Sequence, residues 1–366
     1  MNSQNAKKAS SLTEDRAPRR PFDRAQGGPE SVEGHLSKGR VEERLRAGAA
    51  RLREADVEAP RLCAEMLMAH LLECDRVALH RCSKDELSMD EAARFEALIA
   101  RRVAREPVQQ IVGHTEFWSL DILCDSSVLI PRPETEVVVE TALGILKNRA
   151  APAIADIGTG AGCIAIALAT ELPGARLYAS DISRDALEIA ARNLAAHGLT
   201  QRVQLFEGDL AEPFLRRGLA GELDAIVCNP PYVAESDKPA LQPEVREHEP
   251  ELALYGGRDG LRVVARLLAE TGPLLKPAGH LIIEIAQGQA HAVRELAEKS
   301  AGGPSTNALR QTQAFGSEAQ ARRGHEQRRM AQGRPEIGRM GGWRVVRTIA
   351  DPAGIERVLL IQKEKP

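Results

Sequence analysis

The spacing of apolar residues divides the chain into a helical part and a part in which strands alternate with helices. Between residues 40 and 105, Ala, Leu, Arg and Glu dominate and apolar residues recur every three or four positions. This period predicts a bundle of about four helices. The apolar residues that we expect along its stripe are Leu62, Met66, Ala69, Leu72, Phe95, Leu98 and Ile99. Such a stripe is more typical of a bundle core than of a ligand site.

Shorter apolar runs replace this pattern from residue 107 onward. Residues 107–130 hold two runs interrupted by turn residues, including Gly113, and predict a β-hairpin that links two domains. The segment 131–136, PRPETE, then combines two prolines with carboxylates, which favour the start of a helix that continues through Leu146. A second interpretation is a rigid, proline-braced turn that covers a ligand.

After residue 150, runs suited to buried strands alternate with helical segments. The predicted strands comprise the run before Asp156 and residues 176–180, 203–206, 223–228 and 280–285, with a closing antiparallel pair at 343–347 and 356–361. Helices are predicted at 184–197 and 261–274. This succession indicates an α/β fold built on a mainly parallel sheet.

Two segments lack any such pattern. Residues 1–38 are rich in Ser, Arg, Gln, Gly and Pro, and we expect a disordered leader. Residues 301–340 contain seven arginines, three acidic residues and a single aromatic, Phe315. We expect a disordered insertion at a helix–strand connection, and the alternative is an arm that binds RNA.

Composition narrows the possible functions. The 366 residues, 43% of them hydrophobic, are enough for two domains, and the formal net charge of −3 predicts no general basic surface for nucleic acid. Six cysteines without a Cys-x-x-Cys pair predict reduced thiols and no metal site. No apolar run reaches membrane-spanning length, so we expect a cytoplasmic protein without membrane association.

The most informative stretch is DIGTGAG at 156–162, between a predicted strand and a predicted helix. Glycines at alternate positions remove Cβ atoms, so a ligand can lie against the backbone and the first N–H groups of the helix. Cys163 stands where a dinucleotide fingerprint has its third glycine, which weakens a dehydrogenase interpretation. The loop, followed by a strand that ends at Asp181, resembles the S-adenosylmethionine site of class I methyltransferases. A turn that serves only packing is the alternative.

The predicted strand 223–228 delivers the tetrapeptide NPPY, residues 229–232, to the carboxyl edge of the sheet. An amide nitrogen is a poor nucleophile because its lone pair is delocalised. The side-chain oxygen of Asn229 and the backbone carbonyl of Pro230 can each accept one N–H of a target NH₂ group. Pro231 stiffens the turn, and the ring of Tyr232 offers a face for a planar amide.

Three alternatives to this interpretation remain. The tetrapeptide can be a simple strand-ending turn, or the chain can be a non-catalytic scaffold that binds the cofactor. The same motif also serves enzymes that methylate the amino group of adenine in DNA after flipping the base. Those enzymes need a basic DNA-binding surface, which the net charge does not predict.

Four motifs occur in a fixed order along the chain. They are LIPRPETE at 129–136, DIGTGAG at 156–162, NPPY at 229–232 and EVREHEP at 244–250. Together they closely resemble the peptide chain release factor glutamine methyltransferases, and the likeness extends from about residue 40 to residue 363 apart from the insertion. One departure is Gln110, where many relatives are expected to have an aromatic residue.

The resemblance implies a class I methyltransferase fold. This is a Rossmann-like, mixed seven-stranded sheet with an antiparallel last strand, preceded by a small helical bundle and a β-hairpin linker. The implied domains are a helical substrate-recognition domain at 39–106, the linker at 107–130 and the methyltransferase domain at 131–366. The segment 244–250 is expected to form a loop beside the substrate.

The implied reaction is transfer of a methyl group from S-adenosylmethionine to the glutamine side chain in the Gly-Gly-Gln motif of class 1 release factors. A ribosomal protein is an alternative substrate, and adenine in DNA is a less favoured one. No nucleic acid contact is expected, and the chain is expected to act as a monomer.

The resemblance also assigns residues. The catalytic residues are Asn229, Pro230 and Tyr232, and the substrate-binding residues are Asn229, Pro230, Pro231 and Tyr232. The cofactor-binding residues are Gly158, Thr159, Gly160, Ala161, Gly162, Asp181, Asp209, Leu210 and Asn229. In this assignment Asp181 holds the ribose hydroxyls, Asp209 accepts from the adenine amine and Leu210 packs on the ring. A solvent-exposed turn is the alternative for Asp209.

Overall fold

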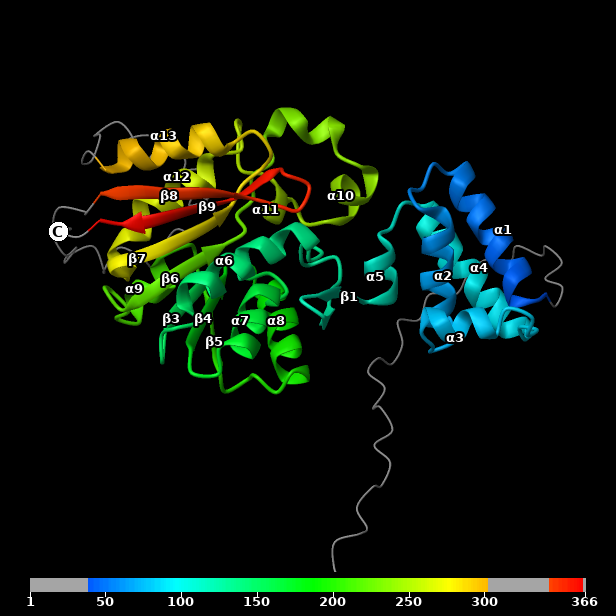
Figure 1. Ribbon diagram of the computed structural model, residues 1–366. Helices are drawn as coiled ribbons and strands as arrows, with labels where there is room; N and C mark the ends of the chain where they lie inside the picture. Colours follow the sequence, from blue (N-terminus) through cyan, green and yellow to red (C-terminus); the bar gives the residue numbers. More distant parts are fainter. Residues whose placement is uncertain (1–38, 302–341, 365–366) are drawn as a thin grey trace, which may run out of the picture. The chain divides into compact units, whose positions relative to one another are not determined.

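The computed structural model describes residues 39–301 and 342–364 (Figure 1). The expectations for residues 1–38 and 302–340 lie outside these described residues. Within the described part, five helices and a two-stranded hairpin come first, and a seven-stranded sheet with its helices follows. No helix in residues 39–301 or 342–364 is both long enough and apolar enough to cross a membrane.

Amphipathic segments with polar caps form the helical region. Its helices are α1 (Val41–Glu54), α2 (Pro60–Leu71), α3 (Arg76–Arg81), α4 (Met89–Val103) and α5 (Val108–Val112). Ser88 caps α4 by accepting from the backbone N–H of Glu91, whose carboxylate accepts from the N–H of Ser88 in return. Phe95 and Ile99 are fully buried in the core of this region, as the apolar spacing predicts.

The buried face of α2 lies about one residue away from the apolar stripe expected from the sequence. Leu62 is 39% exposed, whereas Cys63, Ala64, Leu67 and Met68 are buried. The reason is that apolar residues occupy several faces of α2, so spacing alone did not identify the face that packs on α1 and α4.

The predicted hairpin is shorter than expected. Residues 108–112 form α5, which ends at Gly113 with φ +86°, a conformation that favours glycine. The antiparallel pair is confined to β1 (His114–Phe117) and β2 (Leu120–Leu123), joined by a tight turn. A short helix followed by a glycine was mistaken for a strand because the helix has only five residues, too few to display a helical period.

The seven-stranded sheet has the order β5-β4-β3-β6-β7-β9-β8, as expected for the class I methyltransferase fold. Its strands are β3 (Ala153–Ile157), β4 (Arg176–Asp181), β5 (Val203–Glu207), β6 (Leu223–Cys228), β7 (Leu275–Glu284), β8 (Trp343–Ala350) and β9 (Glu356–Lys363). The first five are parallel, and β9 runs antiparallel to both neighbours. The mixed sheet with an antiparallel last strand is therefore confirmed.

Helices cover both faces of this sheet (Figure 1). One face carries α6 (Glu136–Leu146), α7 (Cys163–Glu171) and α8 (Arg184–Ala196), and the other carries α9 (Glu212–Arg216), α12 (Arg262–Glu270) and α13 (Ala290–Ala301). Because both faces are covered, β3 and β6 are buried along their whole length. The 3₁₀ turn η1 (Pro133–Thr135) leads directly into α6, as the proline-rich sequence indicates.

Two local expectations need correction. The segment 244–250 is largely helical rather than a loop, with α10 (Pro243–His248) followed by α11 (Glu251–Leu254), after η2 (Glu235–Ala240). Pro243 begins α10, and the buried side chain of Glu244 anchors it. The helix expected at 261–274 stops at Glu270, because Pro273 follows and forms the separate turn η3 (Gly272–Leu274).

Candidate active site

The predicted site residues gather at one edge of the sheet. Parallel strands β3 to β7 all present their carboxyl ends there, and these ends carry the glycine loop, Asp181, Asp209, the NPPY segment and Glu284. Sites in α/β sheets form at this edge, where loops from neighbouring strands meet.

The loop between β3 and α7 has the backbone that its glycines predict. Gly158, Gly160 and Gly162 have φ values of +71°, +54° and +84°, which side chains rarely adopt. A Cβ atom built on Gly158 or Gly160 would meet no atom within 4 Å, whereas one on Gly162 would lie 3.3 Å from Ala190. The first two glycines therefore border open space, and the third allows close packing on α8.

Asp181, at the end of β4, is tied to this loop. Its Oδ2 accepts from the N–H of Gly160 at 2.9 Å, and its Oδ1 accepts from the N–H of Ser183 at 2.9 Å. Burial raises the pKa of Asp181, and these backbone donors oppose that shift. The carboxylate is thus held at the loop with lone pairs left for a further donor.

Two buried groups lie beneath the loop. The hydroxyl of Thr159 donates to Oδ2 of Asp156 at 2.6 Å, and burial raises the pKa of Asp156 to about 7. The side chain of Asn193 donates to the carbonyl of Ala161 at 2.8 Å and exchanges two hydrogen bonds with the backbone of Leu123. Asn193 therefore links the glycine loop to the hairpin, a role that no sequence motif indicated.

Asp209 and Leu210 follow β5, but the carboxylate of Asp209 has a protein partner. Arg266 of α12 donates to both of its oxygens, at 3.2 and 2.9 Å, and the Asp209 side chain is 45% exposed. Leu210 has a positive φ of +46° and packs partly buried on the core. Sequence reasoning missed the arginine because it lies 57 positions further along the chain.

The NPPY segment follows β6 directly. Pro230 is buried, whereas Asn229, Pro231 and Tyr232 are half-buried. The side-chain Nδ2 of Asn229 donates to the hydroxyl of Thr135 at 3.1 Å, so the amide is oriented by the turn before α6. The backbone carbonyl of Tyr232 accepts from Gln289 at 3.1 Å.

Tyr232 also contacts a residue that sequence reasoning missed. Its hydroxyl donates to Oε1 of Glu284 at 3.2 Å, and the Glu284 side chain lies at the end of β7. Burial raises the pKa of Glu284 to about 7, and burial next to Glu284 raises the pKa of Tyr232 as well. The charged Glu within the otherwise apolar run LIIEI, residues 281–285, was the available signal.

One ion pair and one hydrogen bond connect further segments of this region. Arg132 pairs with Glu249, whose side chain is 1% exposed, and Gln110 donates to the carbonyl of His248 at 3.1 Å. The amide of Gln110 thus takes a polar partner at the position where an aromatic residue was expected. Ile182, next to Asp181, is 52% exposed and offers an apolar surface at the rim of the loop.

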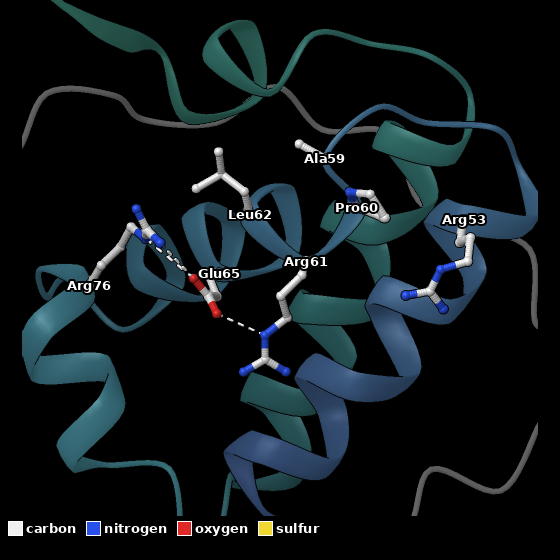
Figure 2. Close-up of a pocket in the computed structure, with 7 residues that line it drawn as sticks. All are labelled: Arg53, Ala59, Pro60, Arg61, Leu62, Glu65 and Arg76. Atoms are coloured by element: carbon white, nitrogen blue, oxygen red, sulfur yellow. Dashed lines mark hydrogen bonds and ion pairs between the residues drawn. The ribbon is translucent and has the colours of Figure 1, made fainter.

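The helical region contains a separate hollow of about 620 Å³ (Figure 2). Its charged lining is mostly paired, because Glu65 accepts from Arg61 at 2.7 Å and from Arg76 at 2.9 Å. The exposed Leu62 also lines it. The hollow therefore combines three arginines and one glutamate with an apolar contact, and arginine is enriched in protein interfaces.

Across residues 39–301 and 342–364, no three His, Cys, Asp or Glu side chains are grouped to hold a metal ion.

Comparisons with known proteins agree with this architecture. A family model described as the PrmC N-terminal domain matches residues 43–113, and one described as the methyltransferase small domain matches residues 137–300.

Curated relatives match across both regions. The release factor glutamine methyltransferase of Rhodospirillum rubrum is 42% identical over 273 residues, 74% of this chain and 81% of that protein. Those of Moorella thermoacetica and Geobacter sulfurreducens are 46% and 45% identical, over 68% and 66% of this chain and 86% and 82% of the relatives. With identity at this level over most of each relative, the chain belongs to the release factor glutamine methyltransferase family.

Proposed function

We propose that this chain transfers a methyl group from S-adenosylmethionine to the side-chain amide nitrogen of the glutamine in the Gly-Gly-Gln motif of class 1 release factors. The observation that carries the proposal is the placement of Asn229, oriented through Thr135, at the same sheet edge as the glycine loop. Family membership supports the substrate class. This reaction would tune translation termination.

The residues at the edge fit the cofactor. Gly158 and Gly160 border open space where a side chain would otherwise lie, and the first turn of α7 presents its N–H groups to the loop. Asp181 is assigned to the ribose hydroxyls, and the exposed side chain of Ile182 adds an apolar contact for a flat base. Bound S-adenosylmethionine supplies an electrophilic methyl group on a sulfonium.

Asp209 has a modified role in this proposal. Its carboxylate is engaged by Arg266, so an adenine amine would share an acceptor rather than meet a free one. Leu210 remains the proposed apolar contact with the ring. The two hydrogen bonds from Arg266 to Asp209 would hold the loop after β5 in one conformation.

The target amide is positioned by the NPPY segment. The Nδ2 of Asn229 donates to Thr135, so the Oδ1 on the other branch of the amide is assigned to one N–H of the target. The carbonyl of Pro230 is assigned to the second N–H, and Pro231 and Tyr232 shape the surface against which the amide plane lies. Two aimed acceptors favour the nitrogen geometry of the transition state, and the excess proton leaves after methylation.

The decisive experiment compares substrates and one catalytic variant. Tritiated methyl transfer is measured with purified class 1 release factor, with the same factor carrying Gln→Ala in Gly-Gly-Gln, with ribosomal protein and with DNA. Label only in the unmodified release factor supports the proposal, and label in DNA or in the Gln→Ala factor contradicts it.

Asn229→Ala should lower kcat by about 10²–10³-fold, because one of two acceptors is lost in the transition state. The affinity for S-adenosylmethionine should change far less. Asn148→Ala, at an exposed asparagine after α6, is the matched control. A near wild-type rate for Asn229→Ala would exclude the proposed geometry, and an equal loss of cofactor affinity would make Asn229 a cofactor ligand only.

We further propose that the helical region at 39–106 contacts the release factor, and that the chain works as a monomer in the cytoplasm, where translation takes place. The hollow beside Leu62 supports a protein contact in that region. Light scattering of the purified chain at the concentration of the transfer assay checks the monomeric state.

A further inference from the structure

The backbone of the NPPY segment is held by a loop from a later part of the chain, residues 254–260, which we call the clamp loop. Val233, directly after the segment, donates its N–H to the carbonyl of Leu254 at 2.9 Å. Its own carbonyl accepts from the N–H of Gly256 at 2.9 Å. These bonds form a short parallel bridge between Val233 and Tyr255. The clamp loop therefore lies directly against the backbone that leads out of NPPY.

Two glycines allow the clamp loop to come this close. A Cβ atom on Gly260 would lie 2.2 Å from the carbonyl oxygen of Tyr232. One on Gly256 would lie 2.6 Å from the carbonyl oxygen of Pro231 and 2.5 Å from that of Gly260. Gly260 has a φ of +74°, which itself favours glycine, whereas the φ of Gly256 is not positive. Close approach of the backbones is therefore the reason for glycine at position 256.

The carbonyl of Tyr232 also accepts a side-chain hydrogen bond. Gln289, the residue before α13, donates to it through Nε2 at 3.1 Å, and its Oε1 accepts from the N–H of Ala286 at 3.1 Å. Turning the Gln289 amide over would place oxygen against oxygen and N–H against N–H, so its orientation is fixed. The Tyr232 carbonyl thus has an aimed donor, and the Cα atom of Gly260 packs against it.

These contacts begin one residue after the carbonyl that the proposed reaction uses. In the part of the chain that the structure describes, the carbonyls of Tyr232 and Val233 have donors, whereas that of Pro230 has none. The proposed function assigns the carbonyl of Pro230 to the second N–H of the target amide. The ring of Pro231 fixes its φ, so few backbone rotations separate the carbonyl of Pro230 from that of Tyr232.

We propose that Gln289 and Gly260 are positioning residues for methyl transfer. By fixing the carbonyl of Tyr232, they hold the carbonyl of Pro230 where it can accept from the target amide. This inference rests on the proposed function, and it assigns neither residue a contact with substrate or cofactor. A loop that only completed the fold would tolerate a small shift of the NPPY turn, whereas an aimed acceptor would not.

Gly260→Ala tests the close approach. Cβ atoms essentially never come within 3.0 Å of another heavy atom, so the added methyl group and the carbonyl oxygen of Tyr232 must separate from 2.2 Å to at least that distance. A displacement of about 1 Å at a reacting group costs on the order of 100-fold in rate. We therefore expect kcat for release factor to fall by about 10–100-fold.

Gln289→Glu tests the hydrogen bond with almost no change in shape. The carboxylate keeps an acceptor for the N–H of Ala286 but presents a second oxygen to the carbonyl of Tyr232. At pH 8, well above the ordinary pKa of glutamate, the two oxygens repel each other and the turn moves. Because Gly260 still packs against the carbonyl, the displacement should be smaller, and kcat should fall by about tenfold.

Each variant has a matched control. Gly218→Ala places a Cβ atom at a φ of +73° where nothing lies within 4 Å, so it adds the same backbone strain without a contact. Gln287→Glu makes the same charge change at an exposed position two residues before Gln289. Both controls should keep kcat. In all four variants the affinity for S-adenosylmethionine, measured by calorimetry, should stay within about threefold of wild type.

A second readout needs neither cofactor nor substrate. The chain has three tyrosines, and only Tyr232 precedes a valine, Val233. Labelling of tyrosine carbonyls with ¹³C and of valine nitrogens with ¹⁵N therefore gives a single correlated NMR signal from this peptide bond. The ¹³C shift of the Tyr232 carbonyl reports its hydrogen bond. It should change in Gln289→Glu and in Gly260→Ala and should match wild type in both controls.

The outcomes separate this inference from the proposed function. If wild type does not methylate release factor, the proposed function fails, whereas the carbonyl shift still tests whether Gln289 holds Tyr232. If wild type methylates and Gln289→Glu keeps its kcat within about threefold of Gln287→Glu, the positioning role is overturned. It is equally overturned if Gln289→Glu loses cofactor affinity as much as kcat, or leaves the carbonyl shift unchanged. Gln289→Glu decides alone if Gly260→Ala does not fold.

Discussion

Glu244→Ala should strongly destabilise the protein, because Glu244 joins the helical region to α10. Its carboxylate accepts from Arg102 at 2.5 Å and from Arg105 at 2.6 Å, and the two partners are 142 and 139 positions away in sequence. Their side chains are 6% and 20% exposed, and that of Glu244 is 11% exposed. Burial alone would raise the pKa of Glu244, but hydrogen bonds from the two arginines lower it.

The expected loss follows from what the variant leaves behind. Removing the carboxylate leaves two guanidinium groups that retain only backbone carbonyl partners, such as Glu106 for Arg102 and Asp56 for Arg105. Breaking a buried pair costs about 3–5 kcal/mol, and the partial exposure of Arg105 places this case near 3 kcal/mol. A loss of this size is about a fifth to three fifths of the roughly 5–15 kcal/mol that stabilises an ordinary domain.

Urea unfolding followed by circular dichroism measures this loss. Glu247→Ala is the matched control on the same helix, because Glu247 pairs with Arg246 in an exposed contact and should cost no more than about 0.5 kcal/mol. Replacing Arg102 and Glu244 together by Met should recover part of the stability, since only Arg105, whose side chain is 20% exposed, then loses its charged partner. Equal midpoints for Glu244→Ala and Glu247→Ala would refute this reasoning.

Asp181→Ala should weaken S-adenosylmethionine binding by about 10–100-fold, since a charged acceptor contributes about 1.5–3 kcal/mol. Unchanged affinity by calorimetry would contradict the assignment of Asp181. Burial raises the folded-state pKa of Asp156 and Glu284 to about 7. The raised pKa of each group therefore stabilises the folded state fully at a pH below the unfolded pKa, which is near 4. This stabilisation, about 3–4 kcal/mol at most for each group, is lost as the pH rises toward 8. The free energy of unfolding, measured by urea titration, should differ less between pH 5 and pH 8 for Asp156→Asn than for wild type. An equal difference in the two proteins would exclude the raised pKa of Asp156.

The arrangement of the sheet was predictable because its signals are local. Each central strand is a short apolar run, and burial on both faces requires such runs whatever helices cover them. The glycine loop was equally visible, because three residues at alternate positions with positive φ need glycine. Assignment of the fold class needed the motif resemblance as well, since runs of this kind occur in many α/β proteins.

The contacts that orient the site were not predictable from spacing. Asn229 and Thr135 are 94 positions apart, and Tyr232 and Glu284 are 52 positions apart. No helix or strand period connects such residues, because only the crossover of the chain between strands brings them together. The helical character of α10 was missed for a similar reason, since the buried pair of Glu244 with Arg102 is not visible in its own sequence.

The polar contacts also explain why the four motifs occur together. Arg132, from the proline-braced segment, pairs with Glu249 of the EVREHEP segment, and Thr135 of the same segment accepts from Asn229 of NPPY. A change in one motif therefore leaves a buried polar group without a partner in another, at a cost of about 1–3 kcal/mol for a neutral group and more for a charged one. The proline-braced turn thus orients the segments around the target amide as well as beginning α6. On this basis, substitutions at Thr135 should affect kcat through Asn229 before they affect folding.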